Sequence, residues 1–347
     1  MDILVFEDDE LDLMIEAINK LQMLFHPTYA PCGDFSFDAI RDLEQKEVAI
    51  FIDNNILSPI YELIITGTAR DQFQAQKVAM FILFTRYIKA QLTCGLALFE
   101  NDTAHKSTIP AEEKRQSFLY GVDKIPSIVW KRLAFGDIVQ IPPVFLASFS
   151  LEDNDTNYSN CEELHFLMHR VAITKMVCLL KDSTINGFQR YLKFFEWYAD
   201  HLLIAESLLV YAALVFGNVE NVAAPKNYKS KDFQKVIKGI NNQAWDMFYL
   251  THWSTYYYTE SENQVFMFAT DDVTQKMIIA NNSPDEFVDL AATIFHSKKQ
   301  KEQLRAIFEA KLGDNRKVPL KKNDKQHNIE ILKNLYNSVE AELQSLM

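Results

Sequence analysis

Glycine is the residue that this sequence has least of for its size. The chain of 347 residues contains nine glycines, where average usage of about 7% would give roughly 24. No two of the nine lie within five residues of each other. A P-loop, a GxGxxG motif and a GxSxG motif all need closely spaced glycines. The sequence therefore excludes these phosphate-binding and nucleophile-bearing motifs.

Cysteine pairs, basic charge and long apolar runs are also scarce. The four cysteines form no CxxC pair, so neither a zinc knuckle nor a disulfide framework is indicated. The 47 acids and 35 bases give a net charge of -12, which excludes a general polyanion binder. The most apolar stretch, 201–217, contains Glu206 and is too short to cross a bilayer. Because the N-terminus is acidic where a signal peptide is basic, we expect a soluble cytoplasmic protein.

Two apolar runs stand out against mostly helical periodicity. Residues 48–52 (VAIFI) and 264–269 (QVFMFA) are typical of strands buried on both faces of a parallel sheet. A third short run, 2–6, is a further candidate strand. Helical spacing predicts helices near 10–24, 71–92, 95–100, 161–181, 187–216 and 241–257, with polar loops around the helices of 110–235. The fold class is therefore α/β, with a parallel sheet flanked by helices.

Both apolar runs end in acids. Asp53 follows the first run, and Asp271 and Asp272 follow the second, while Glu100 and Asp246 lie on predicted helices nearby in sequence. Sites in open parallel sheets form outside the carboxyl ends of the strands. Gathered carboxylates need a hard cation such as Mg²⁺ or Mn²⁺, which supports phosphodiester hydrolysis. Asp is also a common helix cap and turn residue, so a structural role for each acid stays open.

The order and context of these acids resemble those of PIN-like domain nucleases. That family places an Asp after a core strand, a Glu on a middle helix, an Asp on a late helix, and a T-x-D motif after the next strand. The corresponding segments here are FIDNNILS, GLALFE, AWDMFYLTHW and FATDD. The resemblance covers about 47–105 and 240–290. The chain departs from compact PIN domains by well over a hundred residues between Glu100 and Asp246.

The resemblance implies a PIN-like core that a helical insertion divides in two. The implied organisation is an N-terminal β/α extension (1–46), a first core segment (47–109), a mainly helical insertion (110–235), a second core segment (236–292) and a basic helical C-terminal extension (293–347).

The resemblance also implies a metal site and an activity. Four acids would hold one or two Mg²⁺ or Mn²⁺ ions, and three neighbours would orient them. The implied ligands are Asp53, Glu100, Asp246 and Asp272, the neighbours are Asn55, Thr270 and Asp271, and Glu62 and Glu206 are alternatives to Glu100. The expected enzyme is a nuclease, and an endoribonuclease rather than a deoxyribonuclease, since most PIN-like enzymes cleave RNA. Analogy suggests a toxin or defence effector restrained by a regulatory protein, or a homo-oligomer.

Two other functions remain open. The segment ILVFEDDE, a helix and then IFIDNN resemble a phosphoacceptor receiver domain, with Asp8 and Asp9 as magnesium ligands and Asp53 as acceptor. Thr85 and Lys106 fall near the positions where a receiver needs a hydroxyl and a lysine. That resemblance implies a non-catalytic signalling or scaffold protein. The second alternative is a PIN-like fold that binds RNA without cleaving it.

Local basic segments are the candidate nucleic-acid contacts in this acidic chain. Residues 297–325 contain ten Lys or Arg against four acids, and a smaller lysine cluster at 226–238 is interleaved with aromatic residues. Lysines supply salt-sensitive phosphate contacts, and aromatic rings stack on bases. A lysine run is also what a solvated helix face looks like, so both interpretations stay open. The candidates are Lys226, Lys229, Lys231, Lys298, Lys299, Lys301, Arg316 and Lys317.

A histidine pair completes the candidate residues. His165 and His169 are one turn apart with Glu162 preceding them, which is a spacing that zinc or iron sites use. The same stretch is an ordinary amphipathic helix. A structural role for the two histidines is the favoured prediction, because no further ligands can be named.

Overall fold

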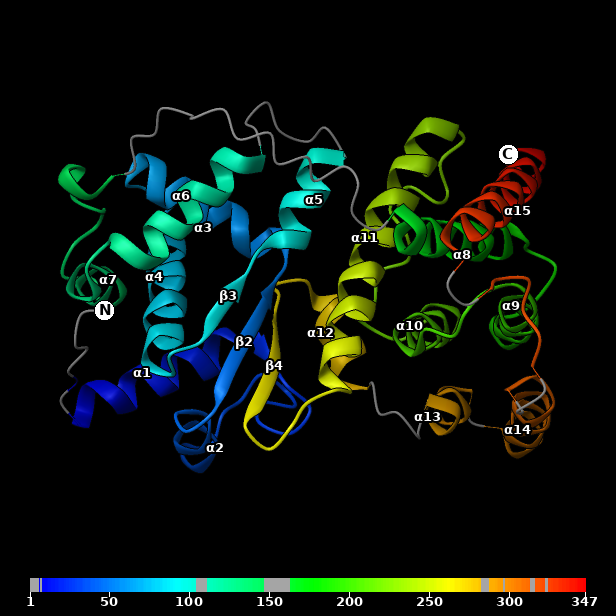
Figure 1. The fold of residues 1–347 in the computed structure, drawn as a ribbon. Helices are drawn as coiled ribbons and strands as arrows, with labels where there is room; N and C mark the ends of the chain where they lie inside the picture. The colour runs from blue at the N-terminus through cyan, green and yellow to red at the C-terminus, as the bar shows by residue number, and fades with distance from the viewer. Residues whose placement is uncertain are drawn as a thin grey trace. The chain divides into compact units, whose positions relative to one another are not determined.

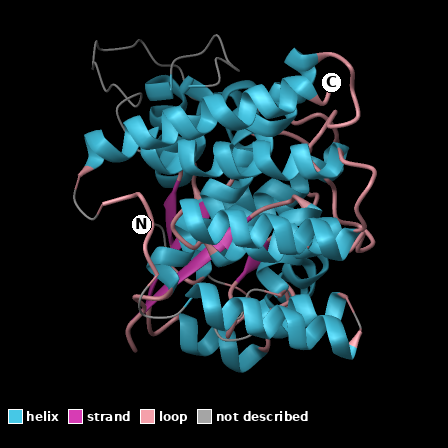
Figure 2. Cartoon of the chain, turned by 90° about the vertical axis from the view of Figure 1, so that its right-hand side faces the viewer, coloured by secondary structure: helices cyan, strands magenta, loops and turns pink. Residues whose placement is uncertain are grey.

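The structure is a computed structural model that describes residues 6, 8–103, 111–146, 163–281, 287–295, 297–312, 316–321 and 324–347. The chain forms two compact units. The first comprises Met1–Cys161 and Trp253–Asp272, and the second comprises Glu162–His252 and Val273–Met347. Helix is the main secondary structure of the described residues (Figure 2). Within them, no helix combines the length and apolar character that crossing a membrane requires.

A four-stranded mixed sheet forms the centre of the first unit, with the strand order β1-β4-β2-β3. The strands are β1 (Leu24–Phe25), β2 (Glu47–Ile52), β3 (Gln91–Thr93) and β4 (Gln264–Ala269). β2 runs parallel to both β3 and β4, with Ile52 opposite Ala269. β1 is an antiparallel edge strand beside β4. The predicted strands at 48–52 and 264–269 are therefore confirmed, and the sheet is mixed where a parallel one was expected. The candidate strand at 2–6 lies outside the described residues except for Phe6.

Helices flank the sheet in the first unit (Figure 1). The helices of this unit are α1 (Asp8–Leu21), α2 (Phe37–Leu43), α3 (Asn54–Thr66), α4 (Gln72–Tyr87), α5 (Gly95–Thr103), α6 (Ala111–Lys124), α7 (Ser127–Ala134) and the short 3-10 turn η1 (Pro143–Phe145). α3 packs against α4, α5 and α6, and α4 packs against α1 and α7. The α/β class is thus confirmed in this unit.

The second unit is helical. Its elements are α8 (Glu163–Lys181), α9 (Gly187–His201), α10 (Glu206–Phe216), α11 (Phe233–Tyr257), α12 (Val273–Ala280), α13 (Phe287–Ile294), α14 (Lys298–Leu312) and α15 (Lys325–Ser345). α11 contributes its residues through His252 to this unit and 253–257 to the first unit. There the Trp253 indole donates a hydrogen bond to the Phe266 carbonyl at 2.8 Å, which fixes the end of α11 to β4.

Several segments differ from the sequence expectation. The helix expected over 71–92 ends at Tyr87, and Gln91–Thr93 pair with β2 as a strand. The helix expected over 187–216 is two helices, because the Tyr198 hydroxyl donates to the Leu203 carbonyl and accepts from the Ala205 N–H at the break. α6 and α7 form where loops were expected. The sequence of α6 lacks an apolar helical pattern, because its buried face includes Glu112, Lys114 and Ser117.

Gly239 on α11 allows a close backbone contact within the second unit. A Cβ atom built at this position would lie 1.7 Å from the Lys226 carbonyl oxygen and 2.7 Å from its carbonyl carbon. Alanine normally stabilises a helix by about 1 kcal/mol relative to glycine. Here we expect Gly239→Ala to destabilise the protein by about 1–3 kcal/mol, because backbone must move apart. Urea unfolding of this variant measures the change in free energy.

Gly95→Ala is the matched control for that substitution. Gly95 begins α5, is exposed, and has no described heavy atom within 4 Å of the place that a Cβ atom would take. Its alanine variant should be neutral or slightly stabilising. Equal effects of the two substitutions would contradict a specific contact at Gly239.

Candidate active site

Asp53 lies at the junction of β2 and α3, where the chain turns from strand to helix. It is the N-cap of α3, and its carboxylate accepts a hydrogen bond from the Asn54 N–H at 2.5 Å. Its own N–H donates to the Ala269 carbonyl of β4 at 3.0 Å, which continues the pairing of the two parallel strands. The cap role that the sequence left open for Asp53 is therefore present. The cap uses only one of the two carboxylate oxygens, since the second accepts a hydrogen bond from Thr270, which follows β4.

The second carboxylate oxygen of Asp53 is held by two side chains. Asn55 donates to it through Nδ2 at 2.6 Å, and the Thr270 hydroxyl donates to it at 3.0 Å. Thr270 is fully buried, and its hydroxyl also accepts the Asp272 N–H at 3.0 Å. The side-chain oxygen of Asn55, Oδ1, accepts a hydrogen bond from the Asp271 N–H at 3.0 Å. Asn55 and Thr270 thus join the end of β2 to the T-x-D segment, and their role as neighbours that orient a metal ligand stays a prediction.

The electrostatics of Asp53 are unusual. Asp53 and Glu100 are only 4% and 5% exposed. Burial raises the pKa of Asp53 to about 7, and the nearby carboxylates of Glu100 and, to a smaller extent, Asp272 contribute to this rise. The hydrogen bonds from Thr270 and from the Asn54 N–H oppose it. The described part of the chain offers Asp53 no ion pair, so its charge is offset by neutral donors alone.

Beside Glu100 lies a polar network that the sequence analysis missed. The next residue, Asn101, donates through Nδ2 to the Asn54 side-chain oxygen at 2.7 Å and to the Ala97 carbonyl at 2.7 Å. The Lys114 ammonium donates to the Asn101 side-chain oxygen at 3.3 Å. Lys114 is itself buried, and burial lowers its pKa. Its position on the polar helix α6 gave no sequence signal, because a lysine on such a helix is ordinarily exposed.

Asp271 and Asp272 have different surroundings. Asp271 is exposed and forms an ion pair with Lys77 of α4 at 2.7 Å. Asp272 is half-buried, and its carboxylate acts on the pKa of Asp53. The T-x-D pattern favours Asp272 over Asp271 as the ligand, and that choice stays a prediction. Lys77 is a second residue that the sequence analysis missed, since 194 positions separate it from Asp271.

The remaining predicted acids belong to α11, α3 and α10. Asp246 belongs to the second unit, where its carboxylate accepts hydrogen bonds from Gln243 and Gln275, both at 3.3 Å. That it joins the other acids stays a prediction. Of the two alternatives to Glu100, Glu62 is exposed on α3 and Glu206 begins α10 of the second unit. Of these three acids, Glu100 is the one whose charge contributes to the raised pKa of Asp53.

The residues of the receiver alternative have other surroundings. Asp9 is exposed in the first turn of α1, and the Glu10 N–H donates to its carboxylate at 3.1 Å. The side chain of Asp8 and the whole of Lys106 lie outside the described residues. Thr85 lies inside α4, where its hydroxyl donates to the Ile82 carbonyl. The carboxylates acting on Asp53 are those of Glu100 and Asp272.

The candidate nucleic-acid contacts all belong to the second unit. The lysines among them are exposed or half-exposed and make no ion pair with a described residue. Lys229 lies 5.5 Å from the centre of the Tyr228 ring. Arg316 instead donates hydrogen bonds to the carbonyls of Ala199 and Leu202 at the end of α9. Its guanidinium therefore has a structural task in addition to any contact with a ligand. The exposed or half-exposed lysines are Lys226, Lys229, Lys231, Lys298, Lys299, Lys301 and Lys317.

His169 is a core residue of the second unit. It is completely buried, and neither ring nitrogen has a hydrogen-bond partner among the described residues. Burial, with a smaller contribution from His165, lowers the pKa of His169 to about 3. Its ring lies 6.3 Å from that of Phe248, and the His165 ring is stacked near the same phenylalanine.

The donor chemistry of the first unit fits a hard cation. Asp53, Glu100 and Asp272 present oxygen atoms only, which suits Mg²⁺ or Mn²⁺. The pKa of Asp53 is raised mainly by burial, and the negative charges of Glu100 and Asp272 add to the rise. As they stand, the described residues contain no group of three or more His, Cys, Asp or Glu side chains spaced to hold a metal ion. Ligation by three acids would therefore need side-chain adjustment.

Together these features define an α/β unit with carboxylates at the carboxyl ends of two adjacent parallel strands, of which Asp53, after β2, is buried. Comparison of the chain with protein families, curated proteins and solved structures found no match.

Proposed function

We propose that this protein is a divalent-metal-dependent nuclease with a PIN-like core, acting on RNA in preference to DNA. The observation that carries the proposal is the burial of Asp53 beside Glu100, which raises the pKa of Asp53 to about 7. Carboxylates kept together at such electrostatic cost are typical of active and metal sites. The preference for RNA rests on the resemblance to PIN-like nucleases.

The proposed ligands are Asp53, Glu100 and Asp272, with Asp246 as a fourth candidate. A bound Mg²⁺ or Mn²⁺ ion would supply an activated water and charge stabilisation for phosphodiester hydrolysis. Asn55 and Thr270 hold one carboxylate oxygen of Asp53, and the Asn54 N–H holds the other, so the ligand is oriented in advance. Thr270 also fixes the backbone of Asp272.

The raised pKa of Asp53 links metal binding to pH. Near pH 7 a large fraction of Asp53 is protonated, and a protonated carboxyl group is a poor ligand. Metal binding should therefore release a proton and tighten as the pH rises through 7. The exposed lysines of the second unit would add salt-sensitive attraction for the nucleic acid. A regulatory protein partner or self-association would restrain the activity, as for toxins and defence effectors.

Cleavage of end-labelled single-stranded RNA and DNA during a Mn²⁺ titration tests the proposal. We expect metal-dependent cleavage by the wild-type protein and at least a ~100-fold slower rate for Asp53→Asn and Asp272→Asn. The size follows because loss of a metal ligand's supporting residue alone costs about 10–100-fold. Glu62→Gln, which removes an exposed acid on α3, is the matched control and should cleave normally.

Undiminished cleavage by Asp53→Asn would refute the site assignment. Metal binding that needs Asp8 and Asp9, without hydrolysis, would instead identify a receiver-like signalling protein. RNA binding that survives replacement of all the proposed ligands, again without hydrolysis, would identify a non-catalytic RNA-binding protein.

A further inference from the structure

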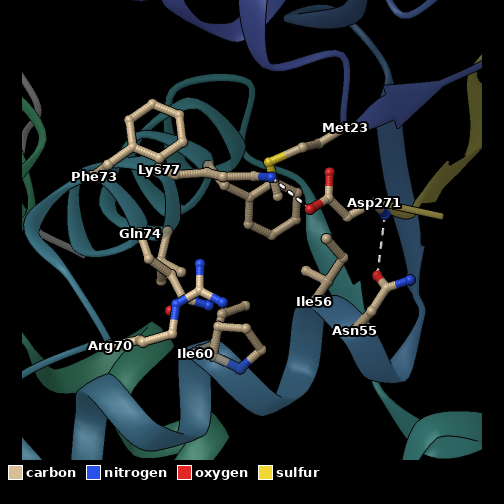
Figure 3. A pocket seen from close by; sticks show the side chains of 12 residues that line it. Met23, Asn55, Ile56, Ile60, Arg70, Phe73, Gln74, Lys77 and Asp271 are labelled. Atoms are coloured by element: carbon tan, nitrogen blue, oxygen red, sulfur yellow. Dashed lines mark hydrogen bonds and ion pairs between the residues drawn. The ribbon is translucent and has the colours of Figure 1, made fainter. Parts of the chain in front are cut away.

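A pocket of about 190 Å³ adjoins the carboxylate site in the first unit (Figure 3). Asn55 and Asp271 form one of its walls, and Asn55 also donates to the Asp53 carboxylate. The pocket therefore shares a residue with the candidate active site. The remaining walls come from α3, α4 and the segment between them, with Met23 in addition.

The floor of the pocket is apolar and its rim is aromatic. Ile56, Ile60, Val78 and Phe81 are buried side chains that line it. Phe73, in the first turn of α4, has 68% of its surface exposed. An exposed phenylalanine beside a pocket is available to stack on a flat ring. The volume is below the roughly 300–1,000 Å³ of pockets that enclose whole drug-sized ligands, so it suits one ring system.

The polar groups of the pocket match a nucleotide. Arg70 is 80% exposed, and its interaction within the described chain is a 3.3 Å contact with its exposed neighbour Asp71. Lys77 also lines the pocket and reaches across to Asp271. With the negative charge of Asp271 included, the lining carries one net positive charge. Arg70, on the side away from Asp271 in Figure 3, is the group available to a phosphate.

Gln74 supplies a hydrogen-bond acceptor in need of a donor. Its Oε1 atom is buried and accepts no hydrogen bond from any described residue. Burying such an oxygen without a partner is costly, so a rotation of the Gln74 side chain that turns this oxygen into the pocket, toward an N–H group of a ligand, would be favourable. Every nucleobase carries at least one N–H donor on its edge. An aromatic ring, a buried acceptor and an arginine thus occur together on the first turns of α4 and just before it.

We propose that this pocket binds the base and phosphate of one unpaired nucleotide of a single-stranded nucleic acid that continues into the carboxylate site. The inference rests on the proposed nuclease function for its substrate. The base stacks on Phe73 and donates to Gln74, and Arg70 contacts a phosphate. A base within a duplex is stacked on its neighbours and cannot enter, so the pocket selects single strands. Because the pocket would hold one nucleotide next to the carboxylate site, it would also set which phosphodiester bond of the nucleic acid reaches that site.

Fluorescence of a Phe73→Trp variant tests the contact without requiring cleavage. The probe is an oligouridylate of eight nucleotides in EDTA, where metal-dependent hydrolysis cannot occur. Because an indole ring stacks on bases as phenylalanine does, we expect the added tryptophan signal to be quenched on binding. Phe37→Trp is the matched control, since Phe37 is also an exposed phenylalanine of the first unit but does not line the pocket. Its signal should not change.

Affinity measurements by fluorescence anisotropy give the second readout. Phe73→Ala and Arg70→Ala should each weaken binding of the labelled oligouridylate by roughly tenfold. Arg70→Ala should also lower the salt dependence, because a phosphate contact is lost. Phe37→Ala and Arg41→Ala, both exposed positions on α2 away from the pocket, should bind like wild type. A blunt duplex of the same length should compete poorly.

The outcomes separate the pocket from the nuclease. Quenching of Phe73→Trp supports the pocket even if no cleavage is found with any metal. Unquenched Phe73→Trp together with wild-type affinity of Phe73→Ala and Arg70→Ala overturns it, even if Asp53→Asn abolishes cleavage. Equal competition by the duplex overturns the selection of single strands.

Discussion

Replacing Asp53 with asparagine should stabilise the metal-free protein at pH 8 while destabilising it slightly at pH 4. The folded pKa of about 7 lies above the ordinary value of 3.8, so the folded state holds a proton that the unfolded state has released. The contribution of this group to stability is therefore fully present below pH 4 and is lost as the pH rises to 7. At about 1.4 kcal/mol per pKa unit, the loss amounts to about 4 kcal/mol.

The asparagine variant avoids that loss but gives up a hydrogen bond. Its side-chain oxygen can still accept the Asn54 N–H, and Thr270 can turn its hydroxyl to accept the new amide. The Asn55 amide, which now donates to Asp53, would face another donor. One such lost hydrogen bond costs about 1 kcal/mol. At pH 8 the avoided cost of the charged Asp53 carboxylate is larger than this, so the variant is more stable than the wild type. At pH 4 only the lost hydrogen bond remains, so the variant is slightly less stable.

Urea unfolding between pH 4 and pH 8 measures this crossover. Glu62→Gln, at an exposed position on α3, should follow the wild-type pH profile. Mn²⁺ added at pH 8 should stabilise the wild type and have little effect on Asp53→Asn, since the ion would neutralise the buried Asp53 carboxylate. Parallel profiles of wild type and Asp53→Asn would show that Asp53 is not buried with a raised pKa.

Substituting His169 with leucine should stabilise the protein, and more at pH 5 than at pH 7. The folded pKa of about 3 lies below the ordinary 6.5, so the unfolded state binds a proton that the folded state excludes. This contribution to stability is complete above pH 6.5 and is lost as the pH falls toward 3. At pH 5 the loss is about 2 kcal/mol. Leucine also removes two buried nitrogens that lack partners among the described residues.

Thermal unfolding of wild type and His169→Leu at pH 7 and pH 5 checks the second expectation. His327→Gln is the matched control, because His327 is a partly exposed histidine of the same unit. It should leave the pH dependence unchanged. If the stability of His169→Leu fell between pH 7 and pH 5 as much as that of the wild type, the acid sensitivity would come from other groups. The two titrations oppose each other, since Asp53 lowers stability as the pH rises and His169 lowers it as the pH falls.

The strands and the acids that follow them were predictable from the sequence. A continuous β-branched and aromatic run such as VAIFI is typical of a strand buried on both faces of a parallel sheet. β2 and β4 accordingly form where they were expected. Asp53 and the T-x-D segment follow their ends, and parallel pairing brings those ends together. β3 was missed because its three residues carry too little pattern, and its pairing with β2 determines it.

The sequence by itself determined the α/β class, the two inner strands and the acids at their ends, because these depend on local runs of residues. The tertiary structure decided which groups surround Asp53. Burial next to Glu100 sets its pKa, and packing of α4 against α3 brings Lys77 to Asp271 and forms the pocket. Each of these pairs residues that are far apart in sequence. Their proximity follows from how the helices pack on the sheet, which no local pattern records.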